Sequence, residues 1–179
     1  MATPLILALG GTRSGKSRFG LATTRRLAGE GRAWFLATAI AGDPELDDRI
    51  SRHRAERPAG WPTIDVGADL AAAIGATEPA EPVLIDGLTL WLAMLLGDDA
   101  PAIDPVLDGP IAAAYHALAA RPGPAIVVSD EVGLGIVPMH PNARAYRDLV
   151  GIAHQRLAAM ADEAYLFVAG LPVTLKGPR

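Results

Sequence analysis

The chain has 179 residues, of which 50% are hydrophobic and 20% charged, and 20 acidic side chains outnumber 16 basic ones for a formal net charge of −4. This length predicts one domain spanning residues 1–179, and the negative charge argues against general binding to nucleic acid. The chain has no cysteine, which excludes disulfides, thiolate metal ligands and a cysteine nucleophile.

No stretch reaches the roughly 18 uninterrupted apolar residues that a membrane-spanning helix needs. The first residues also lack the basic and apolar regions of a secretory signal. We therefore expect a cytoplasmic protein without a transmembrane segment.

The first predicted strand leads into a glycine-rich loop. Residues 5–9 form a short apolar run, and the next eight residues match the phosphate-binding pattern G-x-x-x-x-G-K-[ST]. A helix is expected over 17–29, ending at a glycine. The predicted nucleotide-binding residues of this loop are Gly10, Gly11, Thr12, Arg13, Ser14, Gly15, Lys16 and Ser17.

This pattern has a chemical basis. Small residues at 10, 11 and 15 let the backbone wrap closely around a phosphate, and successive N–H groups form an anion-binding nest. Lys16 can reach the outer phosphates, and the Ser17 hydroxyl suits a Mg²⁺ ligand. The positive end of the following helix dipole also faces the anion. We predict that the chain binds a nucleoside triphosphate.

The following segments alternate between strand and helix patterns. A helix is predicted over 43–57, because Asp43-Pro44 is a typical helix start and Pro58 a stop. Strands are predicted over 33–38, 63–66, 82–86, 125–128 and 164–170, further helices over 68–76, 88–96, 111–120 and 142–162, a loop over 97–109 and a short tail after 170. Strands separated by helices predict an α/β fold with a mostly parallel central sheet flanked by helices.

Polar residues stand at the ends of several predicted strands. Thr38, Asp86 and the pair Asp130-Glu131 all occupy such positions, and ligands bind at the carboxyl ends of parallel strands. Asp86 follows an apolar strand, where an aspartate can hold Mg²⁺ opposite Ser17. We therefore predict Ser17 and Asp86 as ligands of a Mg²⁺ cofactor. The alternative is that Asp86 starts a turn or caps the next helix.

His53 lies in the predicted helix 43–57, on the face that Leu46 and Ile50 turn inward. Its basic neighbours are Arg49, Arg52, Arg54 and Arg57. Nearby positive charge favours the neutral, nucleophilic imidazole and would stabilise anionic phosphates. Taken alone, these residues favour a simpler alternative, a solvated basic helix with an ordinary histidine.

Two classes of P-loop protein are disfavoured by what the chain lacks. No N-K-x-D motif is present, which argues against a Ras-like GTPase, and no arginine-rich lid resembles that of adenylate kinase. Ordinary small-molecule kinases remain possible.

With these segments together, the sequence resembles the bifunctional adenosylcobinamide kinase / adenosylcobinamide-phosphate guanylyltransferase family over nearly its whole length. The most specific features are the phosphate loop, an R-I-x-x-H-R-x-x-R-P segment over 49–58, and an E-V-G-x-G-I-V-P segment over 131–138. The resemblance is also carried by Ala37-Thr38, Trp61, Leu84-Ile85-Asp86, Leu88-Thr89, Ala143-Arg144, Arg147-Asp148, Gly151 and Gln155-Arg156-Leu157-Ala158.

The resemblance implies a RecA-like P-loop NTPase fold, a homotrimer and two reactions. In the first, ATP or GTP phosphorylates the aminopropanol hydroxyl of adenosylcobinamide. In the second, a histidine attacks the α-phosphorus of GTP, and the guanylylated enzyme passes GMP to adenosylcobinamide phosphate to give adenosylcobinamide-GDP.

The resemblance also assigns residues. The nucleophilic histidine falls on His53. Further nucleotide-binding positions fall on Thr38, Ala39, Ile40, Arg54, Ala55, Glu56, Arg57 and Asp65. Glu131 matches an acidic position on the expected cobinamide side.

The chain departs from the family pattern in three places: His154, the segment 139–142 and the pair Gly20-Leu21. They affect neither the phosphate loop nor His53. Two other functions stay open: a small-molecule kinase without nucleotidyl transfer, and a non-catalytic protein whose assembly depends on nucleotide.

Overall fold

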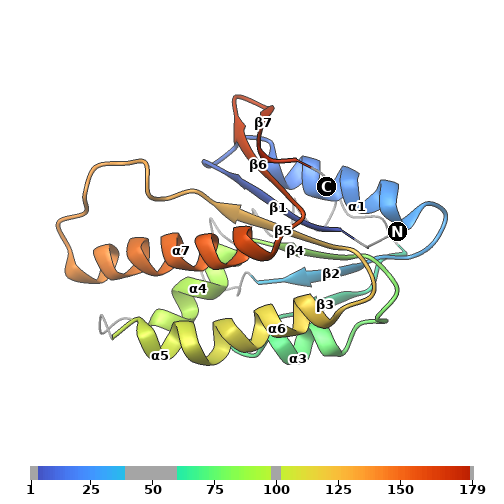
Figure 1. Cartoon of the computed structure of the whole chain (residues 1–179), viewed down its shortest axis with the longest axis horizontal. Helices are drawn as coiled ribbons and strands as arrows, with labels where there is room; N and C mark the ends of the chain where they lie inside the picture. The colour runs from blue at the N-terminus through green and yellow to red at the C-terminus, as the bar shows by residue number, and fades with distance from the viewer. Residues whose placement is uncertain (1–3, 39–59, 98–101, 178–179) are drawn as a thin grey trace.

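The computed structural model describes residues 4–38, 60–97 and 102–177. Strands in these ranges form one sheet in the order β3-β2-β4-β5-β1-β6-β7 (Figure 1). The strands are β1 (Leu5–Gly10), β2 (Trp34–Ala37), β3 (Thr63–Asp65), β4 (Val83–Asp86), β5 (Ala125–Asp130), β6 (Glu163–Val168) and β7 (Leu171–Lys176). Neighbouring strands pair in parallel except β6 with β7. The predicted α/β fold with a mostly parallel sheet is confirmed.

Helices cover both faces of the sheet. One face carries α1 (Lys16–Ala28), and the helices that follow β3 lie on the other (Figure 1). These are α3 (Leu70–Gly75), α4 (Leu88–Leu96), α5 (Asp104–Val106), the π-helical η1 (Leu107–Ile111), α6 (Ala112–Ala120) and α7 (Pro141–Met160).

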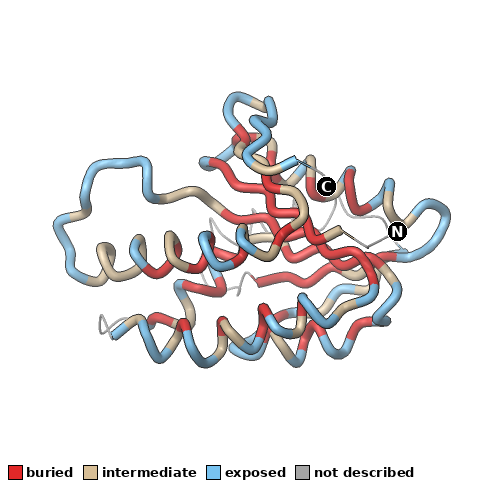
Figure 2. Tube along the Cα trace, in the orientation of Figure 1, coloured by how far each residue is buried: buried red, intermediate tan, exposed pale blue. Residues whose placement is uncertain are grey.

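The central strands are buried on both sides, as Figure 2 shows in red. In β1, the side chains of Leu5, Leu7 and Leu9 join the larger core beneath α4, α6 and α7. Ile6 and Ala8 point the opposite way, into a smaller core under α1. Two covered faces explain why these strands read as continuous apolar runs.

The chain after 170 was predicted as a tail, and this was wrong. Leu171–Lys176 forms β7, which pairs antiparallel with β6 at the edge of the sheet. Pro172 and the shortness of the segment argue against a central strand, but an edge strand tolerates proline. Its alternating apolar residues Leu171, Val173 and Leu175 are exposed, so the strand is not part of the buried centre of the sheet.

The predicted loop 97–109 was also partly wrong, because α5 and the start of η1 lie within it. Pro105 was read as a loop residue, yet it stands in the first turn of α5, where proline needs no N–H partner. The predicted helix 43–57 lies outside the described residues.

Across residues 4–38, 60–97 and 102–177, no helix combines the length and apolar character needed to cross a membrane.

Candidate nucleotide-binding site

The phosphate-loop sequence forms the connection between β1 and α1. α1 begins directly after Gly15, whose φ of 98° lies in the left-handed region that glycine adopts without strain. Gly10 has no room for a side chain, because a Cβ there would lie 2.5 Å from Ser14 Oγ and 2.7 Å from the Phe167 carbonyl oxygen. Glycine is therefore required at position 15 by the backbone conformation and at position 10 by the lack of room for a side chain.

The outer part of the loop lies at the surface. Gly11, Thr12 and Arg13 are exposed, and Arg13 has a φ of 58°, which is uncommon for a residue with a side chain. A Cβ at Gly11 would meet no atom within 4 Å. This stretch of backbone is therefore accessible to a ligand.

Lys16 is buried, with 5% of its surface exposed. Its Nζ donates to the Gly11 carbonyl oxygen at 3.0 Å and lies 2.5 Å from Asp130 Oδ1. Asp130 ends β5, the strand beside β1. Its carboxylate supplies the countercharge that a buried ammonium group needs, and a nucleotide phosphate could take over that role.

The two predicted Mg²⁺ ligands are close together. Ser17 Oγ donates to Asp86 Oδ1 at 3.1 Å. Buried Thr38 holds the backbone behind this pair, because its hydroxyl donates to the carbonyl oxygens of Asp86 at 3.0 Å and Gly87 at 2.6 Å. The N-cap residue of α4 is Gly87, which directly follows Asp86 and has no side chain to cap the helix.

A second polar network anchors Asp130 from the far side. Thr89 Oγ1 donates to Asp130 Oδ2 at 3.2 Å, and the Tyr146 hydroxyl donates to the Thr89 carbonyl oxygen at 3.1 Å. Burial, with a smaller effect of the Asp130 charge, raises the pKa of Tyr146 to about 12, so this hydroxyl stays protonated. Sequence reasoning did not assign a function to Thr89 or Tyr146, because neither carries a local signal for this contact.

The residues flanking Asp130 form a third cluster. His154 Nε2 lies 2.7 Å from Ser129 Oγ, and its Nδ1 lies 3.9 Å from Glu131 Oε2. Burial lowers the pKa of His154 despite the opposing charges of Glu131 and Asp130. Glu131 Oε1 also accepts a hydrogen bond from Gly133 N at 2.5 Å. A neutral histidine thus supports the strand end from which the E-V-G-L-G-I-V-P segment departs.

Asp65 is not close to the phosphate loop. It ends β3, four strand spacings from β1 in the sheet, which corresponds to about 19 Å.

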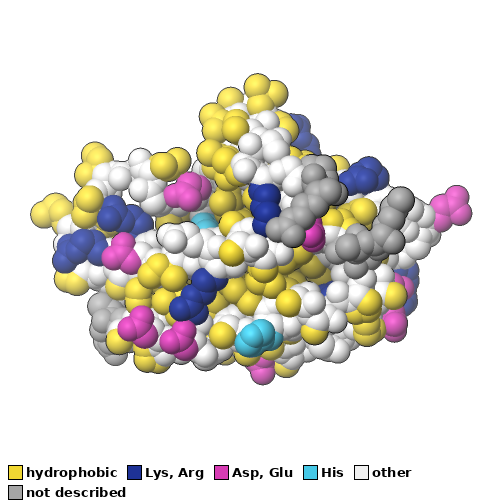
Figure 3. All heavy atoms as spheres, in the orientation of Figure 1, with side chains coloured by type: hydrophobic (Ala, Val, Ile, Leu, Met, Phe, Trp, Pro, Cys, Tyr) yellow, Lys and Arg dark blue, Asp and Glu magenta, His cyan; other side chains and the backbone are white. Residues whose placement is uncertain are grey.

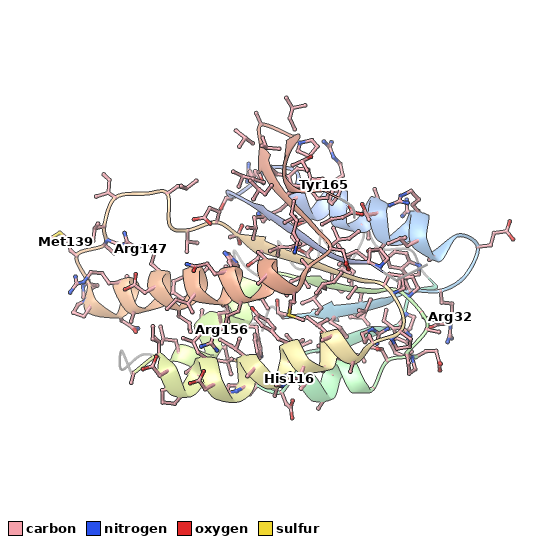
Figure 4. All side chains as sticks on the ribbon, viewed as in Figure 1. Arg32, His116, Met139, Arg147, Arg156 and Tyr165 are labelled. Atoms are coloured by element: carbon pink, nitrogen blue, oxygen red, sulfur yellow. The ribbon has the colours of Figure 1, made fainter. Side chains whose placement is uncertain are left out.

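Other predicted nucleotide-binding or catalytic residues lie outside the described ranges. They are Ala39, Ile40, His53, Arg54, Ala55, Glu56 and Arg57. Of the remaining histidines, His116 is exposed on α6 (Figure 4) and His140 is exposed just before α7.

Comparison with known proteins gives a consistent result. A family model described as cobinamide kinase / cobinamide phosphate guanyltransferase matches residues 6–175. The chain is 44% identical over 174 residues to the bifunctional adenosylcobalamin biosynthesis protein CobP of Pseudomonas aeruginosa, with 96% of each chain covered. It is 36% identical over 184 residues to the bifunctional protein CobU of Salmonella typhimurium, with 96% of this chain and 99% of the relative covered. CobU of Escherichia coli is 34% identical over 183 residues, with the same coverage.

Proposed function

The chain belongs to the cobinamide kinase / cobinamide phosphate guanyltransferase family, and from this membership we propose that it catalyses both reactions of cobalamin nucleotide-loop assembly. It phosphorylates adenosylcobinamide with ATP or GTP. It then transfers GMP from GTP to adenosylcobinamide phosphate, giving adenosylcobinamide-GDP and pyrophosphate.

The observation that carries this proposal is the arrangement of the phosphate loop against the ends of β4 and β5. There, Lys16 Nζ lies 2.5 Å from Asp130 Oδ1, and Ser17 Oγ donates to Asp86 Oδ1 at 3.1 Å. An exposed loop backbone with a buried lysine and a paired hydroxyl and carboxylate is suited to a triphosphate and its counterion.

In the kinase reaction, the oxygen of the aminopropanol hydroxyl forms a bond to the γ-phosphorus as the bond to the β-phosphate oxygen breaks, and the hydroxyl proton passes to water. The leaving nucleoside diphosphate carries the resulting negative charge. Lys16 and the loop N–H groups stabilise the charge on the phosphate oxygens. The described residues can therefore contribute to catalysis in two ways: they place the two substrates, and they stabilise the charge on the phosphates.

Mg²⁺ fits the pair Ser17 and Asp86, since hydroxyl and carboxylate oxygens are hard ligands. Among the described residues, no group of three or more acidic or histidine side chains could hold a metal ion. This agrees with a magnesium ion that takes its other ligands from phosphates and water. When bound, the ion would neutralise phosphate charge.

For guanylyl transfer, we propose His53 as the nucleophile. Its imidazole nitrogen forms a bond to the α-phosphorus while the bond to pyrophosphate breaks. A phosphate oxygen of adenosylcobinamide phosphate then displaces the imidazole, so one difficult transfer becomes two simpler displacements. The assignment is supported by the R-I-x-x-H-R-x-x-R-P segment over 49–58, whose histidine is His53, within a chain that the family model matches over residues 6–175.

We also propose a homotrimer. Apolar side chains gather on the β6–β7 hairpin and on the segment between β5 and α7 (Figure 3). Leu134, Ile136 and Met139 are 82%, 97% and 94% exposed, and Met139 lies at the far end of that segment (Figure 4). Such exposure favours contacts between copies. Light scattering after size exclusion should give three times the chain mass, and a monomer would contradict the proposal.

Incubation with GTP labelled at the α-phosphate tests the proposed function. The chain should acquire an acid-labile, base-stable label, His53→Ala should not, and the exposed His116→Ala should label normally. Equal labelling of His53→Ala would exclude His53 as the nucleophile. Transfer of γ-phosphate without α-labelled protein would indicate a kinase alone, and nucleotide-dependent association without any transfer a non-catalytic protein.

A further inference from the structure

The turn that joins β6 to β7 lies against the phosphate loop, although the two come from opposite ends of the chain (Figure 1). Gly170 N donates to the Ser14 carbonyl oxygen at 3.0 Å. A Cβ built on Gly15 would lie 3.3 Å from Gly170 Cα. The hairpin is thus in direct backbone contact with the predicted phosphate-binding residues.

This turn has an unusual backbone. Ala169 and Gly170 have φ values of 53° and 83°, both in the left-handed region, and they lie between the paired residues Val168 and Leu171. Two consecutive left-handed residues are what a tight two-residue hairpin turn needs. Alanine rarely adopts this conformation, so the surrounding strands hold the turn in its shape.

We propose that the turn Ala169–Gly170 positions the Ser14–Gly15 peptide for phosphate binding, an inference that rests on the proposed function. A planar trans peptide points its C=O and N–H in opposite directions. Because Gly170 holds the Ser14 carbonyl oxygen toward the hairpin, the Gly15 N–H points away from it. This orientation directs the Gly15 N–H toward the inside of the loop, where successive N–H groups form an anion-binding nest.

Gly170 permits a clean test, because a side chain at this position has room and would disturb only the backbone conformation. A Cβ at this position would meet only Arg18 Nη2, at 3.9 Å. A substitution therefore acts by disfavouring the positive φ and not by a clash. Asparagine tolerates this conformation, whereas a β-branched residue does not.

The experiment compares Gly170→Val, Gly170→Ala and Gly170→Asn with Gly29→Val. Gly29 also has a positive φ, of 57°, with no atom within 4 Å of an added Cβ, and it follows the far end of α1, about 20 Å from the loop. Calorimetric titration with ATP and Mg²⁺ gives the dissociation constant, and thermal unfolding gives Tm.

We expect Gly170→Val to weaken ATP binding at least about tenfold, the effect of one misdirected hydrogen bond to a charged group. Gly170→Ala should show a smaller loss, Gly170→Asn a loss below about threefold, and Gly29→Val a lower Tm with unchanged affinity. Unchanged affinity in Gly170→Val, or an equal loss in Gly170→Asn, would overturn the inference. Failure of the unsubstituted chain to bind ATP or GTP would instead refute the proposed function.

Discussion

Lys16 and Asp130 form an ion pair that a bound triphosphate must rearrange, because phosphate oxygens and the carboxylate seek the same ammonium group. The pair is well buried on the lysine side, with 7% of the Lys16 side chain and 27% of the Asp130 side chain exposed. Thr89 holds the second carboxylate oxygen, so Asp130 cannot move away without losing that bond. We therefore expect the carboxylate to oppose the proposed nucleotide binding while it keeps Lys16 in place.

Asp130→Asn should tighten ATP binding by about three- to tenfold, because it removes a negative charge beside the phosphates. Titration calorimetry with ATP and Mg²⁺ would measure this change. Asp69→Asn serves as the control, since Asp69 caps α3 by accepting a hydrogen bond from Ala72 N. Weaker binding in Asp130→Asn would mean that the carboxylate orients Lys16 for the nucleotide.

His154 makes stability depend on pH. Its pKa in the folded chain lies below the ordinary value of about 6.5, so the unfolded chain binds the proton more readily. Above about pH 6.5 the imidazole is neutral in both states, and its contribution to the free energy of unfolding is fully present. As the pH falls below that value, the unfolded chain takes up the proton first and this contribution decreases. Calorimetric Tm values at about pH 7.5 and about pH 5.5 should therefore differ less in His154→Asn than in the parent.

The control for this prediction is His116→Asn, because His116 is exposed on α6. This variant should keep the parent's full change in Tm. If His154→Asn also kept it, the pH dependence would belong to other groups in the chain.

Among the elements, α1 lies unusually close to the sheet. Gly20 faces β4 and β5, and a Cβ there would lie 2.7 Å from Val128 Cγ2 and 3.2 Å from Leu84 Cδ1. This approach sets the height of the helix start, and with it Lys16 and Ser17, above the strand ends. Gly20, which belongs to the Gly20-Leu21 departure from the family pattern, is therefore favoured by the close packing of α1 on the sheet.

Gly20→Ala should lower the free energy of unfolding by about 1–3 kcal/mol, because the added methyl overpacks this contact. Gly151→Ala is the matched control within α7, where a Cβ meets nothing within 4 Å. It should raise stability by about 0.5–1 kcal/mol through helix propensity alone. Urea unfolding measures both, and equal effects in the two variants would contradict the close packing of α1.

At the scale of the whole molecule, the site joins the ends of three neighbouring strands to α1. β4, β5 and β1 are adjacent in the sheet, so Asp86, Asp130 and the phosphate loop meet at one edge. A ligand that contacts all of them would hold together elements that contribute to the cores on both faces of the sheet. We therefore expect it to stabilise the whole fold against unfolding.

Saturation with ATP and Mg²⁺ at about 100 times the dissociation constant should stabilise the chain by about 2.7 kcal/mol, or about 5–10 °C in Tm. Lys16→Ala should abolish the shift in thermal unfolding. Lys176→Ala should retain it, because Lys176 Nζ donates to the carbonyl oxygens of Ala158 and Ala159 at the end of α7. A persistent shift in Lys16→Ala would place the ligand elsewhere.

The sequence by itself determined the phosphate loop, the alternation of strands and helices, and the family. These depend on neighbours along the chain: the spacing of glycines before Lys16, apolar runs of strand length, and segments such as 131–138 that stand in register with the loop. The role of His53 stays a prediction of the sequence, since this residue lies outside the described ranges.

Only the tertiary structure decided which distant residues meet. The contacts of Lys16 with Asp130, of Ser129 with His154 and of Ser14 with Gly170 depend on strand order and on the pairing of β6 with β7, which no local pattern encodes. The same order places β3, which Asp65 ends, four strand spacings or about 19 Å from β1. β7 is short, contains Pro172 and leaves its apolar residues Leu171, Val173 and Leu175 exposed, so its place became evident only once β6 was there to pair with it.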